Sequence, residues 1–317
     1  MSLSRWALAG LLALLAACGE PEPPPSAPPE DIAPTLDTPA QRAADAAYYD
    51  ELRARWLELE HAQRNKPEPE AEPPVVTVPP AAEELQPVSP APVTGMPALA
   101  IVIDDVGHNL LQGRRLLALP APVTLAILPH TQAAQRLAEE AAVQGRSVIL
   151  HQPMESSAGL SIGPGGLYSG MPPDELRRVL QRNLNSVMPV VGLNNHMGSR
   201  LTAERQAMDE VMRVLRERGL FFIDSRTTHH TQAAVAAEAA GVRHLSRNVF
   251  LDNDRDPAAI ARAFDRALDV ARSEGRALVI GHPYPQTLAF LERRLATDLV
   301  AEEGVKVVDV VELLGRE

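Results

Sequence analysis

The chain has 317 residues, is 45% hydrophobic and 22% charged, and carries a formal net charge of −11. Residues 19–96 hold 17 of the 29 prolines and 15 acidic against 5 basic residues, whereas residues 97–317 hold 26 acidic and 24 basic residues. The nearly neutral second part is long enough for a substantial core and lacks the basic excess of a nucleic-acid-binding domain, so these numbers exclude a nucleic-acid partner and favour one domain behind an acidic tail.

The chain begins with a short apolar segment that has the features of a secretory signal. Arg5 precedes an apolar run at residues 6–17, which is short for a membrane span. The run ends in LAAC at residues 15–18 and resembles the signal of a bacterial lipoprotein, in which Cys18 would become the lipidated N-terminus. An ordinary signal peptide with an incidental cysteine is the alternative. The resemblance implies a periplasmic, lipid-anchored protein, and Gly19 favours the outer membrane.

Residues 19–97 are predicted to form a linker. Both of its ends are rich in proline and acidic residues, a composition typical of disordered or polyproline-like segments. Between them, within residues 40–66, apolar side chains from Tyr49 to Leu59 recur at helical spacing. This pattern predicts one amphipathic helix, which either has no partner or docks onto another envelope protein.

From residue 98 onward, short apolar segments alternate with helical stretches. This alternation predicts a parallel sheet with right-handed crossovers, in seven or eight units that form a barrel or near-barrel. The expected strands are 99–105, 123–128, 147–152, 190–195, 220–224, 244–250, 277–281 and 305–308. The expected helices are 109–118, 131–144, 173–187, 203–218, 231–240, 257–274 and 285–300.

The first predicted strand, LAIVIDD at residues 99–105, ends in two acids, Asp104 and Asp105. Adjacent carboxylates repel one another, and neither tolerates desolvation without a partner. A bound cation explains both. Because side chains alternate along a strand, we expect the two acids to point in opposite directions, with Asp105 as a metal ligand and Asp104 as a base.

Other predicted strands also end in polar side chains, among them His151, His196, Asp224 and His282. Because chemistry gathers at the carboxyl ends of barrel strands, we expect these residues to share one mouth. Carboxylate and imidazole groups suit zinc or a similar divalent ion, so His151 and His196 are candidate ligands, although each alone is compatible with a core histidine. His282 fits a general acid, because its ordinary pKa lies near neutrality.

Further polar residues lie close to these strand ends. Glu155 is either another ligand or the partner of Arg200, and we favour the second interpretation. Asp224 is expected to orient a base or a histidine, and Asn195 is a candidate oxyanion donor. The histidines interpreted as lying outside the site are His108, His229 and His230 in exposed loops, and His244 in a structural position.

Five motifs in chain order, IVIDDVG, LHQPME, GLNNHMGS, FFIDSRT and VIGHPYPQT, are together quite specific. Over residues 98–317 the chain resembles the divergent polysaccharide deacetylase family, a branch of the carbohydrate esterases with NodB-type domains. The resemblance implies an α/β fold, a deformed (β/α)7 barrel, with a divalent metal that is usually zinc. It also implies deacetylation of a cell-wall or other polysaccharide.

Within this resemblance, Asp104 matches the catalytic base, Asp105 the metal aspartate and His282 the catalytic histidine. The H-x-x-x-H metal motif of other members reads HQPME here, with Glu155 in place of the second histidine. Their Arg-x-Pro motif is replaced by NNHMGS at residues 194–199. We expect His196 to supply the missing imidazole.

The expected activity is metal-dependent hydrolysis of acetyl groups on a cell-envelope polysaccharide or amino sugar. The alternative is a catalytically silent glycan-binding or envelope scaffolding lipoprotein with the same fold. A metal phosphoesterase is a third interpretation, but the sequence has no dense second-metal cluster or glycine-rich phosphate cradle. Aromatic residues make up 3% of the chain, which is few for a sugar site. The nearest substitutes are Met154, Met197, Tyr168 and Tyr284.

Overall fold

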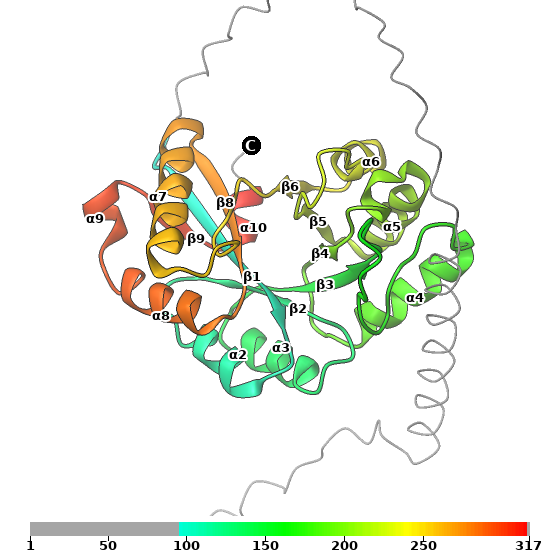
Figure 1. Cartoon of the computed structure of the whole chain (residues 1–317), viewed down its shortest axis with the longest axis horizontal. Helices are drawn as coiled ribbons and strands as arrows, with labels where there is room; N and C mark the ends of the chain where they lie inside the picture. The colour runs from blue at the N-terminus through cyan, green and yellow to red at the C-terminus, as the bar shows by residue number, and fades with distance from the viewer. Residues whose placement is uncertain (1–94, 316–317) are drawn as a thin grey trace, which may run out of the picture. The chain divides into compact units, whose positions relative to one another are not determined.

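A computed structural model describes residues 95–315. The predicted signal segment with Cys18, residues 19–94 of the predicted linker and its helix at 40–66 lie outside the described residues. Strands and helices alternate along this part of the chain (Figure 1). The strands are β1 (Ala98–Val106), β2 (Thr124–Ile127), β3 (Val148–Met154), β4 (Gly192–Met197), β5 (Phe221–Asp224), β6 (His244–Ser246), β7 (Val249–Phe250), β8 (Arg276–Gly281) and β9 (Lys306–Val308).

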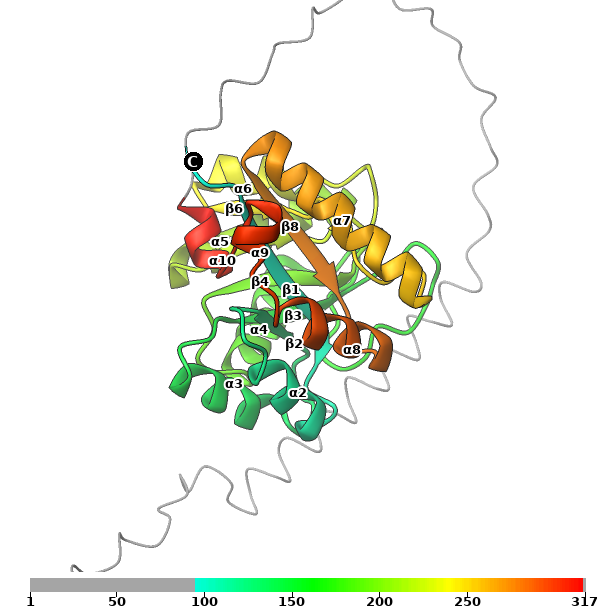
Figure 2. The same cartoon turned by 90° about the vertical axis from the view of Figure 1, so that its left-hand side faces the viewer.

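The helices lie on the outside of the curled sheet, as the two views in Figures 1 and 2 agree, except for the last helix, which packs against apolar residues of the barrel interior. They are α2 (Leu110–Leu117), α3 (Ala134–Val143), α4 (Pro173–Asn185), α5 (Arg205–Arg218), α6 (Ala233–Ala240), α7 (Pro257–Glu274), α8 (Pro285–Arg294), α9 (Leu299–Glu303) and α10 (Val310–Leu314), with a 3-10 turn η1 (Leu201–Ala203). Three of them, α4, α7 and α8, begin with proline, whose fixed φ suits the first helical turn. Within residues 95–315, no helix is both long and apolar enough to cross a membrane.

The sheet follows the order β6-β5-β4-β3-β2-β1-β8-β7, with β9 paired to the start of β1. Every strand pair in residues 95–315 is parallel. This arrangement of strands and outer helices confirms the predicted α/β fold, a deformed barrel.

The expectation of one strand over 244–250 is wrong, because this segment forms two strands at opposite ends of the sheet. β6 pairs with β5, and the chain then switches to β8. At the switch, the Arg247 amide donates to the Asp224 carbonyl at 3.0 Å and the Asn248 amide donates to the Leu278 carbonyl at 2.9 Å. A two-residue link therefore joins both edges of the sheet and brings the barrel close to closure.

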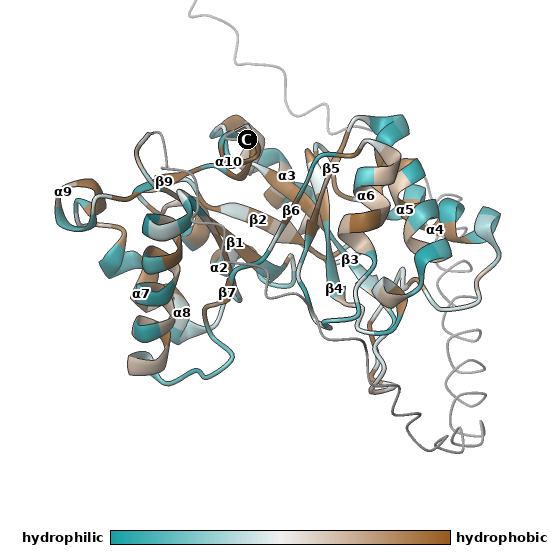
Figure 3. Ribbon diagram, turned by 90° about the horizontal axis from the view of Figure 1, so that it is seen from above, coloured by the Kyte–Doolittle hydropathy of each residue, from teal (hydrophilic) through white to brown (hydrophobic). Residues whose placement is uncertain are grey.

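Two hydrophobic clusters occupy the two faces of the sheet. The larger fills the space between the strands and the outer helices, whose outward surfaces are hydrophilic (Figure 3). The smaller combines residues from the interior face of the barrel with Val310, Leu313 and Leu314 of α10. Helix α10, which the sequence did not predict, thus packs its apolar side chains against the first residues of β1.

The predicted helix 285–300 is too long. Helix α8 ends at Arg294, and α9 begins separately at Leu299. The Asp298 carboxylate accepts hydrogen bonds from the amides of Val300 and Ala301, both at 3.1 Å, and so caps the first turn of α9. This cap fixes the start of a separate helix, so the apolar residues of 285–300 belong to two helices and not to one.

Candidate metal centre

The side chains that face the barrel interior change from apolar to polar at the carboxyl ends of the strands. Val102, Ile149, Ile223 and Ile280 belong to the interior cluster. Because side chains alternate along a strand, the residue two positions further on faces the same interior. The polar interior positions obtained in this way, together with alternate residues of β4, are Asp104, His151, Asn194, His196, Ser225 and His282.

Asp105 departs from this alternation. The register between β1 and β2 shifts between Ile103 and Val106, and Asp105 has a φ of 55° in the left-handed region. Such a bulge turns the Asp105 carboxylate back toward the interior. His151 Nε2 lies 3.7 Å from Asp104 Oδ2 and 3.2 Å from Asp105 Oδ1. The expectation that the two acids point in opposite directions is therefore wrong.

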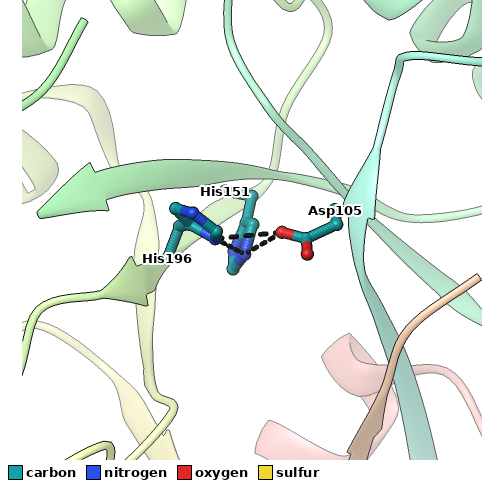
Figure 4. A group of neighbouring side chains, drawn as sticks. All are labelled: Asp105, His151 and His196. Carbon is teal, nitrogen blue, oxygen red and sulfur yellow. Dashed lines mark hydrogen bonds and ion pairs between the residues drawn. The ribbon is translucent and has the colours of Figure 1, made fainter. Parts of the chain in front are cut away.

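Three potential ligand atoms converge in front of this bulge (Figure 4). Asp105 Oδ1 lies 3.2 Å from His151 Nε2 and 2.9 Å from His196 Nδ1. The two imidazole nitrogens are 3.1 Å apart. The side chains come from β1, β3 and β4, so the topology of the sheet assembles the group from three distant segments.

The donor chemistry of this group fits a divalent cation. Asn194 Nδ2 donates to Asp104 Oδ1 at 2.7 Å, so its Oδ1 accepts from His151 Nδ1 at 2.8 Å. Burial lowers the pKa of His151, but the charges of Asp104 and Asp105 produce a net upward shift. In the neutral form that a metal ligand requires, His151 carries its lone pair on Nε2, which faces Asp105. Asp105 Oδ1 is buried and has no hydrogen bond of good geometry in the described part of the chain. A buried carboxylate oxygen without a good hydrogen bond, with two imidazole nitrogens about 3 Å away, is an arrangement that a metal ion would satisfy.

Burial and charge set the ionisation of the two acids. Burial raises the pKa of Asp104 above its usual range, although His151 and His282 act in the opposite direction. Burial also opposes ionisation of Asp105, but the close imidazoles of His151 and His196 hold its pKa well below the usual range. Asp105 is therefore the stronger candidate for a permanently ionised ligand, and Asp104 is the better proton acceptor.

His282 is oriented by a residue that the sequence analysis missed. Its Nδ1 lies 2.8 Å from Asp252 Oδ1, and its backbone amide donates to Asp252 Oδ2 at 2.7 Å. Thr287 Oγ1 also donates to Asp252 Oδ2, at 2.7 Å. Burial lowers the pKa of His282, but the adjacent Asp252 carboxylate, together with the charges of Asp104 and Asp105, raises it by more, so the net shift is upward. Because Nδ1 binds Asp252, Nε2 is the atom of His282 that is free to exchange a proton.

The other predicted site residues lie around the cluster rather than in it. Glu155 Oε1 is 3.5 Å from Arg200 Nε, and Glu155 also accepts from the Ser169 amide. Asp224 accepts hydrogen bonds from the Arg226 amide at 2.8 Å and from a threonine hydroxyl. Neither acid belongs to the group of converging ligand atoms.

Asn195, the predicted oxyanion donor, lies on the opposite face of β4 from Asn194, because the two are adjacent on the strand. Its amide donates to the Met197 carbonyl at 2.6 Å, and its oxygen accepts from the Ser225 amide at 2.9 Å. These contacts tie β4 to the end of β5. The structure therefore brings Asn194, not Asn195, to the cluster.

Four histidines predicted outside the cluster do lie outside it. His108, His229 and His230 are exposed, and His244 is half-buried at the start of β6. The converging group in residues 95–315 therefore uses the two strand-end imidazoles of β3 and β4.

A nearly closed α/β barrel with a carboxylate and two imidazoles converging at the carboxyl ends of its strands defines a barrel protein with a candidate metal centre. Residues 101–314 match the divergent polysaccharide deacetylase family, and the chain belongs to this family. Family and fold therefore point to a polysaccharide deacetylase-like protein, and the resemblance seen in the five motifs is confirmed.

Proteins similar to this region occur in several bacteria. A Haemophilus influenzae protein described as uncharacterized is 41% identical over 197 residues, which cover 62% of this chain and 70% of that protein. The uncharacterized protein YibQ of Escherichia coli is 38% identical over 195 residues, which cover 62% of this chain and 61% of YibQ. The crystal structure of the uncharacterized protein ATU2773 from Agrobacterium tumefaciens superposes with a TM-score of 0.65 at 25% identity, over 71% of this chain and 92% of that one.

Proposed function

We propose that the protein is a metal-dependent hydrolase that removes acetyl groups from a cell-envelope polysaccharide or amino sugar. The observation that carries this proposal is the convergence of Asp105 Oδ1, His151 Nε2 and His196 Nδ1 beside the buried Asp104. A hydrolase of this kind needs a metal site and a separate proton acceptor, and the barrel mouth offers both.

Asp105, His151 and His196 would hold the metal ion. One carboxylate and two imidazoles suit zinc, and the bound ion would supply Lewis acidity for hydrolysis of an amide or ester. Asn194 orients His151 through the hydrogen bond at Nδ1, as ligands of a metal site require.

Asp104 and His282 would move the protons. Asp104 Oδ1 accepts from Asn194, which leaves Oδ2 directed at the cluster as the acceptor for a proton of the attacking water. His282, held through Nδ1 by Asp252, would donate a proton from Nε2 to the leaving amine or hydroxyl oxygen. Burial makes Asp104 a stronger base, and Asp252 keeps His282 protonated at higher pH.

Metal content tests the first requirement of this function, and acetate release tests the reaction itself. Mass spectrometry of the purified full chain should find about one zinc or similar ion, and Asp105→Ala and His196→Ala should lose it, because a three-ligand site does not hold an ion well with two. Asp254→Ala and His229→Ala, which alter exposed residues of the same types, serve as matched controls and should retain it. The absence of metal after reconstitution would contradict the proposal.

The second candidate is a catalytically silent glycan-binding or scaffolding protein with the same barrel. One observation favours it: Glu155, at the position of the second histidine in the H-x-x-x-H motif, pairs with Arg200 and lies outside the ligand group. Such a protein would bind glycan, release no acetate from any acetylated glycan and tolerate Asp104→Asn. A two-metal phosphoesterase has less support, because residues 95–315 contain one group of converging ligand atoms.

We further propose that the mature protein is lipidated at Cys18 and anchored to the outer membrane on its periplasmic side, with residues 40–66 as a docking helix for an envelope protein. The LAAC sequence at residues 15–18 supports the anchor. Labelling with radioactive palmitate and membrane fractionation test it. Cys18→Ser should abolish the label and release the protein from the membrane fraction.

A further inference from the structure

His282 lies in a stack of aromatic rings and guanidinium groups. Its ring is nearly parallel to those of Phe250 and Tyr284, at centroid distances of 6.2 Å and 5.3 Å and interplanar angles of 20° and 29°. The guanidinium carbon of Arg247 is 3.7 Å from the Phe250 centroid, and that of Arg255 is 3.8 Å from the Tyr284 centroid. An arginine guanidinium therefore lies over each aromatic ring beside His282.

The closure of the barrel brings this stack together. Arg247 lies in the two-residue link between β6 and β7, and Phe250 ends β7. Tyr284 directly precedes α8, and Arg255 lies just before α7. Arg247 is fixed in place, because its Nε donates to the Ser225 carbonyl at 2.7 Å and a terminal nitrogen donates to the next carbonyl along the chain at 3.1 Å.

The arginines change what the aromatic rings can offer a ligand. A guanidinium group less than 4 Å from a ring centroid covers one face of that ring and keeps its N–H groups at its own edge. A sugar cannot stack on a face that is already covered. Phe250, Tyr284 and the arginines that cover them form a wall beside His282. The groups that this wall presents to a ligand are therefore guanidinium N–H donors, which recognise carboxylates and phosphates.

In the part of the chain that the structure describes, these arginines make no direct ion pair with an acid. Within residues 95–315, Arg226, Arg247 and Arg255 form no ion pair, whereas Arg114 and Arg115 on the outer helices each bind a glutamate in two hydrogen bonds. Arg226 is exposed beside Arg247, since its carbonyl accepts from the Arg247 side chain. Burial and the Arg226 charge both lower the pKa of Arg247, and together they outweigh the more distant charges of Asp224 and Asp104.

The acids near this wall are already engaged. Asp224 accepts from the Arg226 amide and from Thr231, and Asp254 accepts from the Asp256 amide at 3.0 Å. The Asp256 carboxylate caps α7 by accepting from two backbone amides, at 3.0 and 3.1 Å. An anionic ligand would therefore supply the direct ion-pair partner that none of residues 95–315 provides.

We infer that the glycan is acidic, and that carboxylate or phosphate groups on its sugars bind Arg226, Arg247 and Arg255 next to His282. This inference rests on the proposed hydrolase function only for the place of the acetylated sugar, since the arginines bind the anion without the metal. It assigns the three arginines as specificity residues for a glycan in which an acetamido sugar lies beside an acidic group.

Binding measurements with three defined glycans test the inference. Isothermal titration calorimetry would use the zinc-treated full chain carrying Asp104→Asn, so that bound glycan is not consumed. The probes are a hyaluronan hexasaccharide with carboxylates, an oligomer of N-acetylglucosamine 1-phosphate, and chitohexaose as the neutral glycan. We expect at least one acidic probe to bind about tenfold or more tightly than chitohexaose, because charge-assisted hydrogen bonds are the stronger kind. The acidic probe that binds more tightly identifies the anion.

Affinity measurements on arginine variants test whether these side chains bind the acidic glycan. Arg226→Gln and Arg255→Gln alter exposed side chains, and each removes one charged donor. Each variant should bind the acidic probe about fivefold or more weakly, while its affinity for chitohexaose should not change. Arg266→Gln, an exposed change on α7, is the matched control and should have no effect. The inference is wrong if chitohexaose binds as tightly as both acidic probes, or if neither arginine variant changes the affinity.

Acetate release, measured separately on the chain with its native Asp104, keeps the two proposals distinguishable. Tight arginine-dependent binding of an acidic glycan without acetate release from any probe would overturn the hydrolase and leave the acidic-glycan inference standing. Acetate release with equal affinity for neutral and acidic glycans would overturn the acidic-glycan inference and leave the hydrolase proposal standing.

Discussion

Asn194 Oδ1 accepts a hydrogen bond from His151 Nδ1 at 2.8 Å and thereby directs the other imidazole nitrogen at Asp105. The same amide donates to Asp104, so one side chain connects the proposed proton acceptor to a proposed ligand. A neutral amide does this without adding another charge beside two carboxylates. This relationship makes Asn194 a sensitive point at which to test the site.

Asn194→Ala should weaken zinc affinity by about 10- to 100-fold, the usual cost of removing the hydrogen-bond partner of a metal ligand. Competition with a chromophoric chelator would measure the affinity. Asn185→Ala, at the exposed end of α4, is the matched control and should bind zinc as the wild type does. Unchanged zinc affinity in a folded Asn194→Ala protein would show that His151 does not need this bond.

Asp104→Asn should retain the metal and lower the rate of acetate release by about 10²- to 10⁴-fold, the range that general-base catalysis contributes. The amide has nearly the shape of the carboxylate but cannot accept the proton. Metal analysis and acetate release on the same preparation separate the two effects. Turnover at the wild-type rate would rule out Asp104 as the base.

Asp252→Asn should move the basic limb of the pH–rate profile to lower pH. Burial lowers the pKa of His282, and the Asp252 carboxylate is the main group that opposes this effect, with smaller contributions from Asp104 and Asp105. Without that carboxylate the pKa falls, so the protonated form that donates to the leaving group is lost at a lower pH. The profile of kcat/KM would show the shift, and Asp254→Asn, an exposed change two residues away, should leave it in place.

Gly192→Ala should destabilise the fold by about 1–3 kcal/mol, the usual cost of overpacking a core. A Cβ at residue 192 would lie 2.4–2.7 Å from three atoms of the Phe221 ring, which is buried in the barrel interior. Urea denaturation would measure the change. Gly315→Ala is the control. A Cβ at residue 315 would have its nearest neighbour 3.6 Å away, and the φ of Gly315 is −87°, so the urea midpoint of this variant should stay near that of the wild type.

Much of the barrel and part of the site were predictable because both follow from the alternation of apolar strands and helices. Asp104, His151, His196 and His282 each follow an apolar run, and the topology brings these strand ends to one mouth. The prediction failed by one residue on β4, where Asn195 was selected and Asn194 faces the interior. Counting in steps of two from the apolar interior positions selects the correct neighbour.

Other features depend on pairings that a local pattern does not contain. The bulge at Asp105 requires a φ of 55°, and aspartate is only one of several residues that adopt such a conformation. Asp252 reaches His282 only because β7 pairs with β8, and the sequence gives no sign that residues 244–250 divide between two edges of the sheet. Arg247 joins the proposed wall for the same reason.

The link at Arg247 and Asn248 also protects the sheet from other chains. Strand edges expose unpaired backbone groups onto which a second molecule can add as a further strand, a common beginning of aggregation. Here the edge strands β6 and β7 have three and two residues, and the link occupies the main-chain groups between them. A barrel with such short edges offers an incoming strand little to pair with.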